Sequence, residues 1–389
     1  MKKLLILLIL AFPMMSLARE QCRMAFELEL LQPKVFSKGL KVFTSTANRQ
    51  IVFDYVRPAK GKNTLVLLHG LGDSMYHLEA MADLAIRSGM GVLRVDLHGH
   101  GRTLSEFVKR HGDIPAELNF RDNIEDVRDL IKYLNLKQVS ILGHSYGGGI
   151  AFGLAVELQN VRGIVVRSLH MLAPYVQRID KFFSDYVKSP QFLVNNAGKV
   201  LESSGVSSGT VNTIMGPLFF MASQLAMNVQ FLQSSVRRAL LLDQTKDIFL
   251  DPWMDGFMRM TYREYFLITE HKKGKVLSDT EREDINLKVE AAIKATKGIR
   301  GFDLLDRALG LPKKLPPLQI IGGKADQLVV EEQLKDFAFR LDHDHLPYEL
   351  VMLDSDRASH LFPRTMPDQV FGKVKEFMDA GAGPQRPGK

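Results

Sequence analysis

The stretch from residue 139 to residue 158 constrains the fold most, because it joins three local signals in one short run. Residues 139–142 form a short apolar run typical of a buried strand, and residues 150–158 have the character of a buried helix. Gly143-His144-Ser145-Tyr146-Gly147 stands between them. The two glycines would let strand and helix approach closely, which predicts a strained backbone at Ser145 and an outward hydroxyl. A glycine-rich turn whose serine only caps the helix is the alternative.

The size and composition of the chain predict a globular protein with a substantial core. It has 389 residues, of which 46% are hydrophobic and 24% are charged. Such a chain accommodates one large α/β domain with an insertion, or two domains. We therefore expect disorder only near the ends, as in the Gly- and Pro-rich tail at 381–389.

The first 18 residues resemble a secretory signal. Met1-Lys2-Lys3 is followed by apolar residues up to Phe12 and by Ser16-Leu17-Ala18, small residues that suit a cleavage site. This predicts a signal peptide at 1–18 and a secreted mature protein, in a bacterial periplasm or outside the cell. An uncleaved anchor is the alternative, although the apolar run is shorter than the ~20 residues that span a bilayer.

Charge and cysteine content limit the partners and cofactors. Removal of Lys2 and Lys3 lowers the formal net charge from +7 to +5, and the remaining basic residues are scattered without interleaved aromatic residues. This pattern argues against a nucleic-acid partner. Cys22 is the only cysteine, so neither an intramolecular disulfide nor a cysteine metal site is expected.

Strand-like and helix-like segments alternate through most of the chain. The alternation favours a mostly parallel sheet flanked by helices, with a hairpin turning near Asn48 at one edge. The strands are expected at 41–44, 51–56, 64–68, 91–96, 139–142, 161–166, 317–323 and 348–353, and the helices between them at 78–87, 123–134, 150–158 and 368–378.

Between residues 175 and 310 the strand-like runs stop and the sequence becomes helical. Helices are expected at 176–187, 211–232, 235–242, 258–270 and 281–295, and Ser278-x-x-Glu281 is a capping-box pattern at the start of the last one. The predicted organisation is therefore a core formed by 19–174 and 311–380, with 175–310 inserted as a helical cap.

Three residues with complementary chemistry follow three of the expected strands. Ser145, Asp326 and His360 stand in loops after strands, and the carboxyl ends of parallel strands meet at one edge of a sheet. A serine hydroxyl is a poor nucleophile unless an imidazole takes its proton, and a carboxylate can hold that imidazole in the required tautomer. The order Ser, Asp, His along the chain is one of the orders that such triads use.

At this point the chain resembles the α/β-hydrolase superfamily of serine esterases and lipases. The resemblance covers roughly 41–173 and 315–378. Its marks are His69-Gly70-Leu71-Gly72, Asp96-x-x-Gly99-x-Gly101, Gly143-His144-Ser145-Tyr146-Gly147-Gly148, Gly322-Gly323-Lys324-Ala325-Asp326 and Ser359-His360, where Ser359 replaces the glycine common in the family. The same scaffold serves many substrates, so the marks indicate the fold more than the substrate.

The resemblance implies a role for each site residue. Ser145 would be the nucleophile, His360 the general base and Asp326 the residue that orients it. The backbone N–H groups of Leu71 and Tyr146 would form the oxyanion hole. No cofactor is expected.

Each assignment has a structural alternative. Asp326 could be a turn or helix-capping residue, His360 could be a surface histidine, and Asp354 or Asp356 could supply the carboxylate but are more typical of a solvated turn. His69, His98 and His100 are interpreted as residues that shape loops. The alternating His343 and His345 lack a third ligand, so no metal is expected.

The helical insert contains Met215, Phe219 and Phe220, soft side chains that suit a pocket for acyl chains or the core of the insert itself. The expected function is hydrolysis of small-molecule or lipid esters, with transient contact between the lid and a membrane surface. An amidase, peptidase, thioesterase or acyltransferase on the same triad is the enzymatic alternative, and a ligand-binding member without turnover is the other.

Overall fold

The computed structural model describes residues 40–177, 274–299, 314–326 and 328–380, with isolated positions at 259–272, 303–304 and 311–312. The chain divides into two compact units, Met1–Ala25 with Ile179–Val276 and Phe26–Arg178 with Leu277–Lys389. Nearly all of the described residues belong to the second unit. The predicted signal peptide, the C-terminal tail, Met215, Phe219, Phe220 and the helices expected at 211–232 and 235–242 lie outside the described residues.

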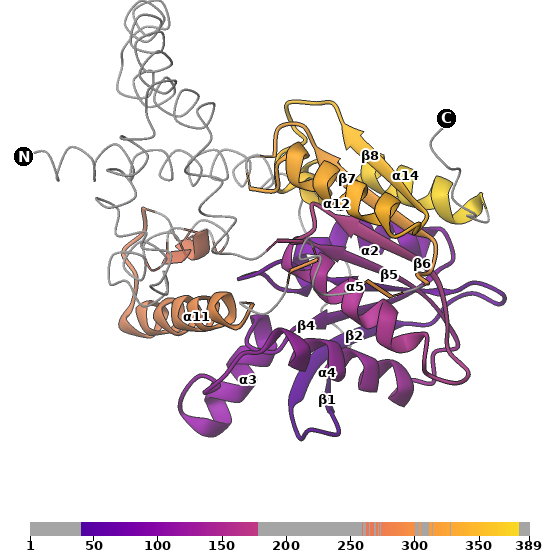
Figure 1. Ribbon diagram of the computed structural model, residues 1–389. Coiled ribbons are helices and arrows are strands. Elements are labelled where there is room, and N and C mark those ends of the chain that lie inside the picture. Colours follow the sequence, from indigo (N-terminus) through magenta and orange to yellow (C-terminus); the bar gives the residue numbers. More distant parts are fainter. Residues whose placement is uncertain are drawn as a thin grey trace, which may run out of the picture. The chain divides into compact units, whose positions relative to one another are not determined.

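A mostly parallel eight-stranded sheet forms the centre of the second unit, with the order β1-β2-β4-β3-β5-β6-β7-β8 (Figure 1). β1 pairs antiparallel with β2, and β2 with β4, whereas the remaining neighbours pair parallel. The edge hairpin and the parallel sheet predicted from the sequence are confirmed. The strands are β1 (Lys41–Thr44), β2 (Gln50–Val56), β3 (Thr64–Leu68), β4 (Gly91–Asp96), β5 (Gln138–His144), β6 (Val165–Leu172), β7 (Leu318–Gly323) and β8 (Tyr348–Leu353).

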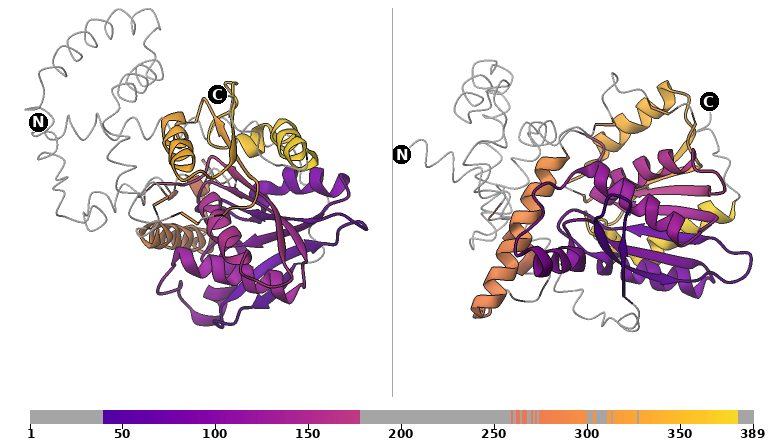
Figure 2. Two further views of the ribbon diagram at one scale, coloured as in Figure 1. Left: turned by 45° about the vertical axis from the view of Figure 1, so that its right-hand side comes forward. Right: turned by 90° about the horizontal axis from the view of Figure 1, so that it is seen from below.

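Helices cover both faces of this sheet (Figure 2). On one face, α14 packs against α2, β6 and β7. On the other, α4 packs against α5, and Phe152 of α5 meets Phe337 of α12 with ring centroids 6.2 Å apart. The helices are η1 (Met75–Leu78), α2 (Glu79–Arg87), α3 (Gly101–His111), α4 (Phe120–Tyr133), α5 (Tyr146–Leu158), α11 (Asp279–Gly298), α12 (Glu331–His343), α13 (Phe362–Thr365) and α14 (Pro367–Asp379).

The prediction for β6 was wrong by several residues. The strand runs over Val165–Leu172, because Gly163 adopts a left-handed φ of 86° and belongs to the turn after α5. The true strand was hidden by polar residues that are buried inside it. Ser168 hydrogen-bonds to Ser140 at 2.8 Å and His170 Nδ1 to Gln319 at 2.9 Å, so these groups are satisfied across neighbouring strands.

The helix α3 was missed, since residues 98–102 were interpreted as a loop. It begins at Gly101 and buries only Thr103 and Leu104, which leaves a weak apolar pattern in the sequence. The Thr103 hydroxyl accepts from Val52 N–H at 2.8 Å and donates to the Asp96 carbonyl at 2.7 Å. These bonds fix the start of the helix to β2 and β4.

The helix α11 confirms the expected capping box. Ser278 Oγ accepts from the Glu281 amide at 3.2 Å, and the Glu281 carboxylate accepts from the Ser278 amide at 3.0 Å. Ala291 and Ala295 of this helix pack in one cluster with Leu104, Ile114 and Leu118. The helix α11 therefore belongs to the same compact unit as the sheet, Phe26–Arg178 with Leu277–Lys389. The bounds expected for the insert, 175–310, stay a prediction.

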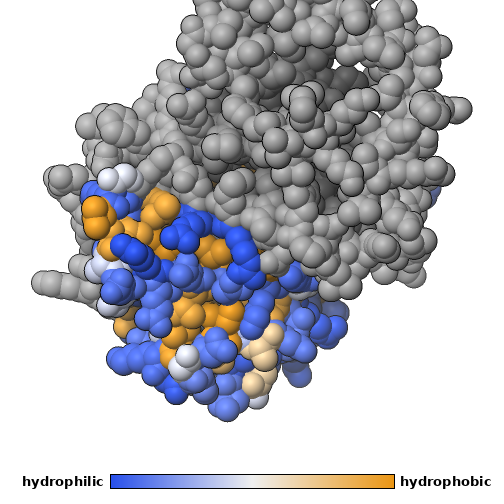
Figure 3. Space-filling model, turned by 90° about the vertical axis from the view of Figure 1, so that its left-hand side faces the viewer, coloured by the Kyte–Doolittle hydropathy of each residue, from blue (hydrophilic) through white to orange (hydrophobic). Residues whose placement is uncertain are grey.

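The surface in Figure 3 shows how the described residues of one face meet solvent. Hydrophilic residues separate the apolar ones across this part of the face. In the described part of the chain, no helix is both long and apolar enough to cross a membrane.

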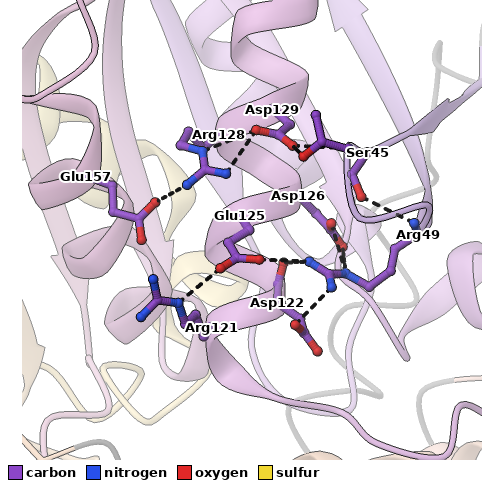
Figure 4. A network of polar contacts seen from close by, with 10 residues as sticks. Ser45, Arg49, Arg121, Asp122, Glu125, Asp126, Arg128, Asp129 and Glu157 are labelled. Atoms are coloured by element: carbon purple, nitrogen blue, oxygen red, sulfur yellow. Dashed lines mark hydrogen bonds and ion pairs between the residues drawn. The ribbon is translucent and has the colours of Figure 1, made fainter.

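A charged network attaches the β1–β2 turn to α4 (Figure 4). Arg49 Nε donates to both oxygens of Asp126 at 3.0 Å, and its other nitrogens reach Asp122 at 3.0 Å and Glu125 at 3.4 Å. Asp126 has a side chain only 1% exposed, and burial raises its pKa. Arg49 thus compensates a carboxylate that has little access to water.

We predict that Arg49→Ala lowers the free energy of unfolding by about 3 kcal/mol, because it leaves Asp126 buried without its cation. Arg121 is the matched control, since its side chain is 77% exposed and pairs with Glu125 on the same helix. Arg121→Ala should cost less than about 1 kcal/mol. Urea unfolding measures both, and equal losses for the two variants would contradict the prediction.

Candidate active site

The turn between β5 and α5 holds Ser145 in a strained backbone conformation. Its φ is 53° and its ψ is −118°, a region that costs a non-glycine residue about 1–3 kcal/mol. Hydrogen bonds from the exit of β6 hold it there. The Ser145 amide donates to the Leu172 carbonyl at 2.9 Å, and the Ser145 carbonyl accepts from the Tyr175 amide at 2.9 Å.

Two glycines make this turn as tight as the sequence predicted. A Cβ added at Gly143 would lie 2.0 Å from the Gly147 carbonyl oxygen, and one at Gly147 would lie 2.3 Å from the Leu68 carbonyl oxygen. Backbone atoms cannot yield as a flexible side chain can, so both positions require glycine. From Val139 to Phe152, Ser145 is the one residue that is not buried.

Asp326 and His360 are brought together although they lie 34 residues apart. His360 Nδ1 is 2.9 Å from Asp326 Oδ2, and the Asp326 side chain is fully buried while the His360 side chain is 11% exposed. Because a carboxylate only accepts, Nδ1 carries the proton and donates it. In a neutral ring with this tautomer, Nε2 of His360 carries no proton and can act as a base.

The second oxygen of Asp326 serves the loop itself. Asp326 Oδ1 accepts from the amides of Leu328 at 2.8 Å and Val329 at 2.9 Å. Asp326 therefore both stabilises its own turn and pairs with His360. The rival Asp354 instead pairs with Lys324 at 2.8 Å and has a side chain 78% exposed. Asp356 is also exposed.

The His360 loop is attached directly to the serine turn. His144, which precedes Ser145, places its Nε2 atom 2.8 Å from the carbonyl oxygen of His360. The two imidazole rings have centroids 4.9 Å apart. The structure thus gathers the loops of Ser145, Asp326 and His360 at one edge of the sheet.

The turn after β3 lies beside the serine. A Cβ on Gly70 would be 3.5 Å from Ser145 Cβ, which places the 69–72 turn at the serine. His69 fixes this turn, because its Nε2 accepts from the Leu97 amide at 3.1 Å and its Nδ1 lies 2.8 Å from the Gly70 carbonyl. His69 therefore shapes the loop, as the sequence suggested.

The two expected oxyanion donors occupy different positions. Tyr146 is the first residue of α5, so its amide belongs to the first turn, where helical N–H groups have no acceptor within the helix. Leu71 is half-buried in the turn beside Ser145. The positive end of the α5 dipole adds to the attraction for an anion at this place.

Asn123, which the sequence did not single out, supports the side chain of Tyr146 beside the serine turn. Its amide donates to the Tyr146 hydroxyl at 3.2 Å, and its oxygen accepts from the His98 amide at 2.7 Å. Asn123 is 1% exposed in α4. The expected helix began at Asn123, where asparagine is a usual cap, whereas α4 begins at Phe120 and places Asn123 inside the helix. The ring of His100 stacks on the ring of Tyr146, with centroids 5.7 Å apart.

Among the described residues, no group of three or more His, Cys, Asp or Glu side chains is arranged to hold a metal ion. His343 Nδ1 pairs with the adjacent Asp344 at 2.9 Å, and His345 adopts a φ of 57° in the turn that follows α12.

Comparison with known sequences identifies the family. The sequence model described as "Alpha/beta hydrolase family" matches residues 65–373, which is more than half of the chain. The chain belongs to this family. The predicted family and fold are confirmed by this match and by the strand order of the sheet.

Two curated relatives show the range of activities around this α/β hydrolase. It is similar to a "Putative esterase/lipase" of Haemophilus influenzae, with 32% identity over 25% of this chain and 31% of the relative. It is also similar to a "Proline iminopeptidase" of Clostridioides difficile, with 36% identity over 25% of this chain and 31% of the relative. The chain thus matches less than a third of the length of either relative.

Solved structures agree on the fold. A structure from a study of epoxide hydrolases in metagenomes from hot environments covers 90% of this chain and 100% of its own, with 17% identity and a TM-score of 0.51. At this identity the likeness concerns the fold alone.

Buried histidines make the stability of this α/β hydrolase sensitive to acid. Burial lowers the pKa of His69, His98, His100 and His170 from 6.5 to about 4. Unfolded histidines bind protons near pH 6.5 while these folded ones remain neutral. The stabilisation is therefore complete above pH 6.5 and is lost as the pH falls toward 4.

We predict that His170→Gln flattens this dependence. Each such histidine contributes a slope of about 1.4 kcal/mol per pH unit between the two pKa values. The variant removes one whose ring nitrogens contact Ser168 and Gln319. Urea unfolding at several pH values between 7 and 4.5 measures the slopes, and carboxylates titrate alike in both proteins. Parallel curves for wild type and variant would show that His170 does not couple to folding.

Proposed function

We propose that this α/β hydrolase cleaves carboxylic esters through an acyl-enzyme on Ser145, with His360 as general base and Asp326 as its orienting carboxylate. The observation that carries the proposal is the 2.9 Å pair of His360 Nδ1 and Asp326 Oδ2, in a loop hydrogen-bonded to the serine turn. An isolated surface histidine would need neither a fully buried carboxylate nor a link to that turn.

The reaction follows from these groups. His360 Nε2 takes the proton of the Ser145 hydroxyl as its oxygen bonds to the ester carbonyl carbon. The carbonyl oxygen becomes negatively charged, and the N–H groups of Tyr146 and Leu71 stabilise it by donating hydrogen bonds. The alcohol then leaves with the proton from His360. A water molecule, deprotonated by the same imidazole, attacks the acyl-enzyme and releases the acid with Ser145 restored.

Other functions of the same fold differ in how well they fit this chain. A peptidase or amidase would use the same groups on an amide, and the likeness to a proline iminopeptidase favours it as the second candidate. Thioester cleavage and acyl transfer would also use this triad. An epoxide hydrolase or dehalogenase is disfavoured, because the family members with those activities place aspartate where this chain has Ser145. A binding protein without turnover would retain the fold but not react.

The remaining parts of the proposal rest on the sequence. We propose a secreted enzyme, released after residue 18 into a periplasm or the extracellular space. Its inserted segment, with Met215, Phe219 and Phe220, would form a hydrophobic pocket for acyl chains. The same segment would contact a membrane surface transiently. Small-molecule or lipid esters are the proposed substrates.

We predict that a fluorophosphonate probe labels the purified mature protein and that Ser145→Ala abolishes the labelling. Asp326→Asn should slow it on the order of a hundredfold or more, because the amide cannot hold the imidazole in the working tautomer but can still accept from the loop amides. Asp354→Asn is the matched control and should label like wild type. Labelling rates compare the variants, and absence of labelling in the folded wild type would favour the binding protein.

We further predict that p-nitrophenyl esters with medium or long acyl chains have higher kcat/KM than the acetate. Each buried methylene adds about 0.8 kcal/mol of transfer free energy, so a pocket for the chain raises kcat/KM stepwise with length. The matching p-nitroanilides test the amide alternative. Preference for the acetate alone would exclude the acyl-chain pocket while leaving the triad unaffected.

A further inference from the structure

The histidine that precedes the serine is enclosed by three parts of the site at once. His144 is 2% exposed at the end of β5. Its ring stacks on His77 of η1 with centroids 4.7 Å apart and an interplanar angle of 17°, and meets Phe362 of α13 edge-on at 6.5 Å. A Cβ on Gly70 would lie 3.3 Å from its Nδ1 atom. The ring therefore fills the space between the 69–72 turn, called the oxyanion turn below, and the His360 loop.

The hydrogen bond of His144 has only one direction. The carbonyl of His360 can only accept, so His144 Nε2 carries the proton and donates it across 2.8 Å. Burial then holds the ring neutral, with a pKa well below the usual value. Its Nδ1 atom is buried without a hydrogen-bond partner among the described residues. An orphaned nitrogen costs stability, so a histidine chosen for packing alone would be a poor choice here.

The neighbouring pair fixes the stack from the other side. His77 Nδ1 contacts Asp73 Oδ2 in the same turn-and-helix segment that follows the oxyanion turn. Asp73 therefore holds His77, His77 supports the ring of His144, and His144 holds the backbone of His360. This series of contacts joins the segment that follows the Leu71 turn to the loop that carries His360.

We infer that His144 is a positioning residue, whose Nε2–H holds the His360 loop against the serine turn and sets the imidazole for proton transfer from Ser145. The inference rests on the proposed function for its kinetic consequence, but the hydrogen bond itself is a property of the folded protein. It assigns a role to the residue that stands between Gly143 and Ser145.

Two substitutions separate positioning from packing. His144→Phe retains an aromatic ring for the stack but removes the donor and also the orphaned nitrogen. His144→Gln retains an N–H near the position of Nε2. We expect His144→Phe to keep or raise the melting temperature while kcat falls on the order of ten- to a hundredfold, with KM little changed, because a small displacement of a catalytic group costs that much. His144→Gln, which still has a donor, should retain most of the wild-type kcat.

A second measurement does not depend on the substrate. The Nδ1 proton of His360, hydrogen-bonded to Asp326, should give a strongly downfield NMR signal in wild type and in His144→Gln, and a shifted or broadened one in His144→Phe. Wild-type kcat and an unchanged proton signal in His144→Phe would overturn the inference. Failure of wild type to label at Ser145, together with the expected change in that signal, would instead overturn the proposed function alone.

Discussion

The strained backbone at Ser145 is the constraint on which the rest of the site depends. A left-handed φ at a non-glycine residue persists only when its surroundings hold it. Here the Ser145 amide donates to the carbonyl of Leu172, the last residue of β6, and the Ser145 carbonyl accepts from the amide of Tyr175, which follows this strand. Because Gly147 has no side chain, α5 can approach the Leu68 carbonyl at the end of β3 closely. The site thus draws its rigidity from three neighbouring strands and not from the turn alone.

The parallel sheet converts distant sequence positions into one site. Strands β3, β5, β7 and β8 end at the same edge, so the loops after them meet there without long connections. Asp326 shows how a single residue then has two tasks. One carboxylate oxygen organises its own loop through two amides, and the other binds His360. Loss of this carboxylate would disturb both the loop and the base, which is why an asparagine variant is more informative than an alanine variant.

Sequence analysis predicted those parts in which local pattern and tertiary environment agree. The strands β3 and β4 are buried at every residue, β3 as an apolar run and β4 with Arg94 and Asp96 among apolar residues, and their predicted bounds match the structure. It failed where a polar residue is buried through a distant partner. Ser168 and His170 concealed β6, and Asn123 was hidden because its partners, Tyr146 and the His98 amide, come from other segments. No local pattern encodes such pairings, since each polar group is satisfied only after the sheet has formed.

The buried histidines extend this argument to the chemistry of the site. A histidine on a buried surface is costly when charged, and the fold keeps His69 and His144 neutral by burial. Neutral imidazoles can donate from one nitrogen only, so each is committed to a single carbonyl, that of Gly70 or of His360. Neutrality thus gives both rings a fixed tautomer and a fixed direction. In consequence the 69–72 turn and the His360 loop are positioned by imidazoles that stay neutral, whereas the reaction that we propose would charge His360.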